Sequence, residues 1–175
     1  MKRPHHYKST IFRYAKKKER VEEMNAEFEV KHAWLSSTNM TLSKIRNTKK
    51  KLVELGIAAN IDPCIVAISF VYYEKLIIKK AICRENNKLF AVTGLYLAIK
   101  FWGAKSHNFK GFLQDAENVF GKTPKEVLQA EFTVYTELMF RLFVDSAHYK
   151  PHLQRLESSQ IFLDHLFETN KQHRE

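Results

Sequence analysis

The chain has 175 residues, of which 45% are hydrophobic and 13% aromatic, and it carries a formal net charge of +10. This length can bury one sizeable core but is short for two. Only five glycines and four prolines are present. Because β-sandwiches and barrels use many such residues in their tight turns, we expect an all-α protein.

The sequence shows no membrane segment. No stretch reaches the roughly 18 consecutive apolar residues that a membrane span needs, and the first residues lack the apolar centre of a signal peptide. We therefore expect no membrane partner and a location in the nucleus or cytoplasm. Residues 1–61 hold 14 Lys and Arg against 6 Asp and Glu. Such a basic segment suits nucleic acid, an acidic lipid surface or an acidic protein, and charge alone does not choose among them.

Residues 1–40 are predicted to form a basic tail followed by a helix. The polar first nine residues indicate a mobile tail, and a loosely amphipathic pattern predicts a helix from Thr10 to about Lys31. The pattern then breaks, which indicates a loop. We expect Trp34 in this loop to fill a core.

Residues 41–145 are predicted to form a domain of five helices. The first is expected to end at Gly56, because glycine favours the left-handed conformation after a helix. The second has a clear start, since Asp62 is a good N-cap and Pro63 is favoured at the first helical position.

The third predicted helix, residues 88–102, is apolar on nearly every side, so it should be the centre of the domain. Lys100 near its end is a charge that must reach solvent or meet a partner. A fourth helix fits residues 109–120.

The fifth predicted helix begins at a capping box formed by Thr123 and Glu126, with Pro124 at its first position. We expect it to run to about Phe143. Its predicted core-facing stripe consists of apolar residues at helical spacing: Leu128, Phe132, Tyr135, Leu138, Met139 and Leu142. Glu131 falls inside this stripe and is a second charge on a face that should be buried.

Residues 146–175 are predicted to contain a loop and a last amphipathic helix near residues 158–170. Pro151 should prevent a helix within the loop. His148 and His152 are four residues apart, but without that helix they are not aligned as metal ligands, so we expect no metal site there.

No pattern typical of catalysis is present. The eight histidines and two distant cysteines lack the spacing of zinc ligands, and there is no Gly-rich phosphate loop and no marked nucleophile. We expect neither enzymatic activity nor a cofactor.

Five helices around a hydrophobic third helix, with a lysine near its end and a glutamate early in the fifth, resemble a cyclin box. In cyclins this lysine and glutamate lie side by side on the surface that grips a cyclin-dependent kinase. The resemblance implies that Lys100 and Glu131 contact such a kinase, around its mobile small-lobe helix.

Several stretches are similar to the Cables proteins, adaptors described as cyclin-dependent kinase and Abl enzyme substrates. They include EEMNAEF, VAISFVYYEKL, ENNKLFAVTGLYLAIK and EVLQAEFTVYTEL. The resemblance implies a non-catalytic adaptor that binds a cyclin-dependent kinase and modulates its phosphorylation or activity in cell-cycle control. It also makes an Abl-type tyrosine kinase a second candidate partner.

Two alternatives remain. The first predicted helix of the domain carries basic residues that form either a solvated face or a secondary binding surface: Lys44, Arg46, Lys49, Lys50 and Lys51. A nucleic-acid-binding cyclin fold would use them, but base-reading side chains and interleaved aromatics are not visible, which disfavours it. The other alternative is a degenerate cyclin fold that scaffolds proteins without a kinase.

Overall fold

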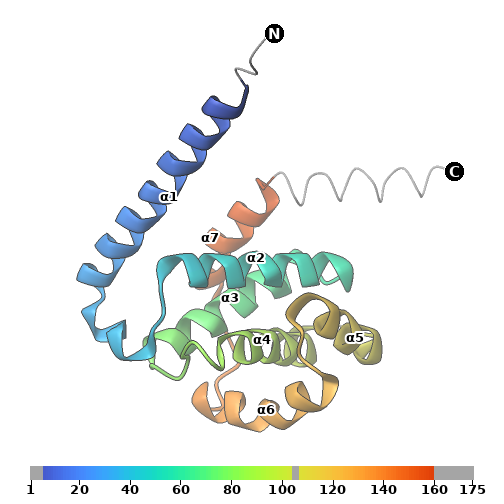
Figure 1. Ribbon diagram of the computed structural model, residues 1–175. Coiled ribbons are helices and arrows are strands. Elements are labelled where there is room, and N and C mark those ends of the chain that lie inside the picture. Colours follow the sequence, from blue (N-terminus) through green and yellow to red (C-terminus); the bar gives the residue numbers. More distant parts are fainter. Residues whose placement is uncertain (1–5, 104–106, 160–175) are drawn as a thin grey trace, which may run out of the picture. The chain divides into compact units, whose positions relative to one another are not determined.

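The computed structural model describes residues 6–103 and 107–159, with side chains from residue 17 onward (Figure 1). The helix predicted near residues 158–170 lies almost wholly outside these residues. Within them all regular structure is helical and no strand occurs, which confirms the all-α prediction. None of the described helices is long and apolar enough to cross a membrane.

The chain divides into two compact parts, residues 1–47 and residues 48–175. The first contains helix α1 (His6–Lys31), the 3-10 helix η1 (Ala33–Thr38) and the start of α2 (Leu42–Ala58).

The expected loop after α1 is the helix η1, and the prediction for Trp34 within it is wrong. Trp34 is 39% exposed, whereas the adjacent Leu35 is 3% exposed. Successive residues of a 3-10 helix point about 120° apart, so only one of this apolar pair faces inward.

The first turn of α2 is capped by a side chain of another helix. The backbone N–H and the hydroxyl of Ser43 donate to Oδ1 of Asn25 in α1, at 3.0 and 3.1 Å. Thr41 adds a local cap, since its Oγ1 accepts from the N–H of Lys44 at 3.3 Å. Two donors of the first turn, which have no partner within a helix, are thereby satisfied.

Helix α2 continues through Gly56, so the predicted end at this residue is wrong. Gly56 is buried, and a Cβ at this position would lie 2.6 Å from Cγ2 of Val66 in α3 (Pro63–Ile78). Gly56 therefore allows α2 to approach α3 closely instead of ending the helix.

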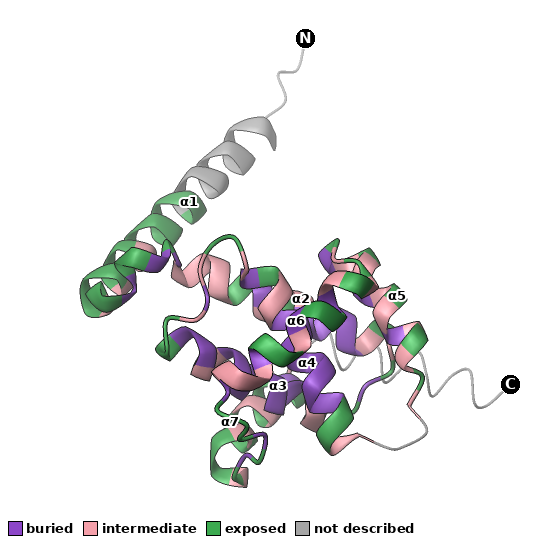
Figure 2. Ribbon diagram, turned by 90° about the horizontal axis from the view of Figure 1, so that it is seen from below, coloured by how far each residue is buried: buried purple, intermediate pink, exposed green. Residues whose placement is uncertain are grey.

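Helices α3 and α4 (Asn87–Trp102) form the core of the second part, and Figure 2 shows both as largely buried. The carboxylate of Asp62 accepts from the N–H of Cys64 at 2.7 Å, which confirms the predicted cap of α3. In α4, all nine residues of 91–99 are buried. Helix α4 packs against α3, α5 (Phe109–Phe120) and α6 (Pro124–Glu137), so it is the central helix that the sequence predicts.

A buried polar network joins α2, α3 and α4. The hydroxyl of Tyr73 donates to Oδ1 of Asn87 at 2.5 Å, and Nδ2 of Asn87 donates to Oγ1 of Thr48 at 2.8 Å. Burial raises the pKa of Tyr73 to about 12, so its hydroxyl remains a donor at neutral pH.

Helix α6 begins at the predicted capping box. The N–H of Glu126 donates to Oγ1 of Thr123 at 3.3 Å, and the N–H of Thr123 donates to Oε2 of Glu126 at 2.8 Å. The helix ends at Glu137, earlier than predicted, because the chain turns at Met139 and Phe140, whose φ angles are 55° and 58°.

The buried face of α6 differs from the predicted stripe, of which only Leu138 and Leu142, beyond the end of the helix, are buried. Its buried residues are Val127, Ala130 and Val134. Leu128 and Phe132, which were predicted to face the core, are 47% and 70% exposed. Apolar residues lie on two faces of α6, and α4 covers only one of these faces. Glu131 therefore does not lie on a buried face.

The loop predicted around Pro151 is instead helix α7 (Ser146–Glu157). Asp145 caps this helix, and its carboxylate accepts from the N–H of Ala147 at 2.8 Å. Proline removes one backbone hydrogen bond from a helix interior, but α7 packs along α3, and this contact supports the helix.

Candidate partner-binding surface

The structure brings together the two charges that the sequence singles out. Lys100 lies in the last turn of α4, Glu131 lies in α6, and Nζ of Lys100 is 2.5 Å from Oε1 of Glu131. Their side chains are 44% and 25% exposed. The pair is therefore accessible to a partner, although the apolar stripe placed Glu131 on a buried face.

Lys100 carries its positive charge at neutral pH. Its hydrogen bond to Glu131 raises the pKa of Lys100, and its ammonium lies 5.4 Å from the ring centroid of Tyr96. Ion pairs this exposed usually contribute about 1 kcal/mol or less to stability. An ammonium has three donors and a carboxylate two acceptor oxygens, so the pair can hold together and still bind main-chain groups of another protein.

An apolar surface carried by α4, α6 and the segment that follows α6 accompanies the pair. We call it the aromatic surface, and its exposed members are Phe101, Leu128, Phe132, Met139, Phe140 and Phe143. Their exposed fractions lie between 47% and 70%. Exposed large apolar side chains grouped in this way are typical of protein-binding sites.

Ring contacts join the phenylalanines of the aromatic surface in two groups. The ring of Phe101 lies 5.4 Å from that of Trp102, which in turn lies 5.6 Å from Phe143. On α6, the ring of Phe132 lies 6.4 Å from that of Phe140. Sequence reasoning missed this surface because it assigned Leu128 and Phe132 to the core. The signal was present, since α6 has more apolar residues than one buried face can hold.

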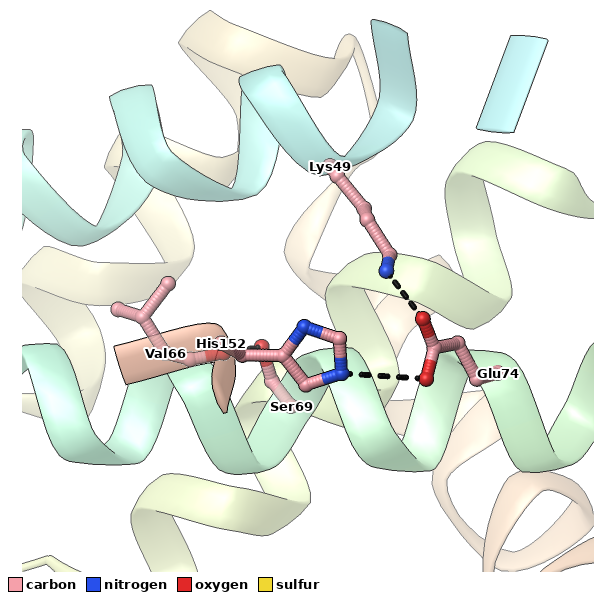
Figure 3. Close-up of polar contacts among 5 residues, drawn as sticks. All are labelled: Lys49, Val66, Ser69, Glu74 and His152. Carbon is pink, nitrogen blue, oxygen red and sulfur yellow. Dashed lines mark hydrogen bonds and ion pairs between the residues drawn. The ribbon is translucent and has the colours of Figure 1, made fainter. Parts of the chain in front are cut away.

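A second polar cluster joins α2, α3 and α7 (Figure 3). Nζ of Lys49 donates to Oε1 of Glu74, and Nε2 of His152 lies 3.2 Å from Oε2 of the same carboxylate. Burial alone would raise the pKa of Glu74, but the hydrogen bonds from His152 and Lys49 outweigh it and lower this pKa to about 2. The side chains of Lys49 and His152 are only 21% and 15% exposed, so the cluster is an internal connection.

Two of the five basic residues of the predicted secondary surface are bound within the fold. Lys49 is held by Glu74, and Nζ of Lys51 donates to the carbonyl of Val119 at 2.9 Å. Of the other three, Lys44 donates to the carbonyl of Asn39, Arg46 is exposed to solvent, and Lys50 pairs with Glu54. The ammonium groups of Lys49 and Lys51 thus already have a partner within the fold.

No metal-binding cluster occurs among the described residues. His148 and His152 do share helix α7, contrary to the prediction, but His152 is engaged by Glu74. Cys64 and Cys83 are both free thiols.

Comparison with known proteins relates the chain to one family. Residues 10–143 match the family described as "Cyclin, N-terminal domain". The chain is 32% identical over 155 residues to human "CDK5 and ABL1 enzyme substrate 1", covering 87% of this chain and 24% of that protein. It is 29% identical over 151 residues to mouse "CDK5 and ABL1 enzyme substrate 2", covering 86% of this chain and 31% of that protein. The chain thus spans less than a third of these relatives, and no solved structure matches it.

Proposed function

Because this chain belongs to the cyclin N-terminal domain family, we propose that it is a non-catalytic adaptor for a cyclin-dependent kinase. It binds the kinase and modulates its phosphorylation or activity in cell-cycle control, in the nucleus or cytoplasm. The similarity to proteins named CDK5 and ABL1 enzyme substrates points to a regulatory family. CDK5 is therefore the first kinase to test, and an Abl-type kinase is the second.

The observation that carries this proposal is the exposed Lys100–Glu131 pair, together with the aromatic surface on α4, α6 and the segment that follows α6. A protein interface typically combines apolar anchors, which supply most of the affinity, with a few charged groups that fix orientation. Lys100 can donate to carbonyl groups of the kinase, and Glu131 can accept from its N–H groups.

The test is the affinity of purified CDK5 for the full chain, measured by isothermal titration calorimetry. We expect the double variant Lys100→Ala/Glu131→Ala to weaken binding about ten-fold or more, which corresponds to about 1.4 kcal/mol. Circular dichroism should show unchanged helix content, because the exposed pair adds little stability.

A matched control is available on α2. Lys50 and Glu54 form another exposed pair, with Nζ of Lys50 3.8 Å from Oε1 of Glu54. Lys50→Ala/Glu54→Ala should leave the affinity unchanged. Equal affinity of wild type and the folded Lys100→Ala/Glu131→Ala variant would remove these residues from the interface. Absence of binding to CDK5 and to a panel of other cyclin-dependent kinases would refute the function.

A further inference from the structure

The segment between α6 and α7, residues 138–145, is a turn that presents three members of the aromatic surface: Met139, Phe140 and Phe143. We call it the α6–α7 turn. Met139 and Phe140 are consecutive residues with φ of 55° and 58°. This region is unfavourable for residues with a Cβ, so the conformation persists only where surrounding contacts determine it.

Two side chains hold this turn from the protein interior. The hydroxyl of Tyr72 in α3 donates to the carbonyl of Leu142. The indole Nε1 of Trp102 lies 3.1 Å from that hydroxyl and 3.2 Å from the same carbonyl. Tyr72 is fully buried, and burial raises its pKa to about 12, so its O–H remains a donor at neutral pH.

The carbonyl of Leu142, which Tyr72 and Trp102 hold, lies between the exposed Phe140 and Phe143 in the sequence. Leu142 and Val144 are 8% and 3% exposed, whereas Phe140 and Phe143 are 57% and 70% exposed. Fixing the backbone at Leu142 therefore fixes the direction in which both rings point outward. Trp102 also supports one ring directly, because its ring lies 5.6 Å from that of Phe143.

We infer that Tyr72 and Trp102 are positioning residues, which hold the α6–α7 turn so that Phe140 and Phe143 are ordered before the kinase binds. The inference rests on the proposed function, since the kinase is the partner that the ordered rings meet. Pre-ordering raises affinity because the turn loses less conformational freedom on association. Neither Tyr72 nor the indole N–H needs to touch the kinase.

The test replaces Tyr72 by Phe in the full chain, which removes the hydroxyl and keeps the ring. We expect its affinity for CDK5 to fall about five-fold, as for the loss of one hydrogen bond that orders an interface. We also expect faster amide hydrogen exchange at residues 139–144 than in wild type.

The matched control is Tyr73→Phe. It removes the hydroxyl of the adjacent buried tyrosine, which bonds Asn87 in the other network. It should lower stability to a similar extent without changing affinity or exchange in the α6–α7 turn. Equal losses of affinity in Tyr72→Phe and Tyr73→Phe would show an effect of general stability and would overturn the inference.

A double-mutant cycle with Phe140→Ala completes the test. If Tyr72 acts through the turn, Tyr72→Phe should weaken binding less in the Phe140→Ala background than it does in wild type, because only Phe143 is then left to be ordered. Should Tyr72→Phe not fold, Trp102→Phe removes the other donor and answers the same question.

Two outcomes separate this inference from the proposed function. Unchanged affinity of Tyr72→Phe, with weakened binding of Phe140→Ala, would overturn the positioning role and leave the kinase interface intact. Unchanged affinity in both Phe140→Ala and Lys100→Ala/Glu131→Ala would overturn the kinase interface itself.

Discussion

The carboxylate of Glu74 receives hydrogen bonds from Lys49 in α2 and His152 in α7. Replacing Glu74 by Gln removes its charge and keeps its shape, so Lys49 and His152 both lose the carboxylate that binds them. We expect the variant to be less stable at neutral pH and the connection of α7 to α3 to weaken.

The magnitude follows from the pKa. A pKa of Glu74 that falls from 4.5 to about 2 on folding corresponds to about 3 kcal/mol of stabilisation of the charged form. The side chain of Glu74 is 41% exposed, so screening by solvent reduces this value, and we expect about 1–2 kcal/mol. Because the folded pKa is the lower one, the contribution is complete above about pH 4.5 and is lost as the pH falls toward 2.

Urea unfolding of wild type and Glu74→Gln, followed by circular dichroism at pH 7 and pH 3, measures this contribution. The difference in unfolding free energy should be about 1–2 kcal/mol at pH 7 and much smaller at pH 3. Glu54→Gln is the control, since Glu54 forms only an exposed pair with Lys50 at 3.8 Å. A difference for Glu74→Gln that is equal at both pH values would refute the electrostatic explanation.

Two further predictions concern the helices themselves. Thr123→Ala removes the acceptor for the N–H of Glu126, and urea unfolding should show a loss of about 1 kcal/mol; an unchanged midpoint would contradict the cap. Gly56→Ala places a methyl group 2.6 Å from Cγ2 of Val66, so we expect a loss of about 1–3 kcal/mol. Adding Val66→Ala should then cost less than it does in wild type, and fully additive losses would exclude a clash between these two positions.

The elements that sequence reasoning located well are those with local signals. The cap of α3 at Asp62 and the capping box at Thr123 and Glu126 join residues two or three positions apart, so their bonds can be recognised without the fold. The pairing of Lys100 with Glu131 needed more, because these residues are far apart in the chain. It could be predicted only from the resemblance to a cyclin box.

The remaining differences come from tertiary packing. Periodicity shows that residues 124–137 can form a helix, but α6 has apolar residues on two faces, and only the position of α4 decides that Phe132 stays exposed. The turn at Met139 and Phe140 contains no glycine to indicate it. The helix around Pro151 likewise depends on its contact with α3, which local propensity does not contain. The aromatic surface was missed because the sequence does not show which of the two apolar faces of α6 is covered by α4.

The burial of all nine residues 91–99 in α4 has a consequence for motion. Amide hydrogens in a segment covered on every side exchange mainly when the whole domain opens, so α4 should include the slowest-exchanging amides of the chain. Lys100 follows this segment directly, and its backbone therefore shares the rigidity of the core. The backbone of Lys100 is therefore already ordered before a partner binds its ammonium, so the main chain loses little conformational entropy at this residue on association.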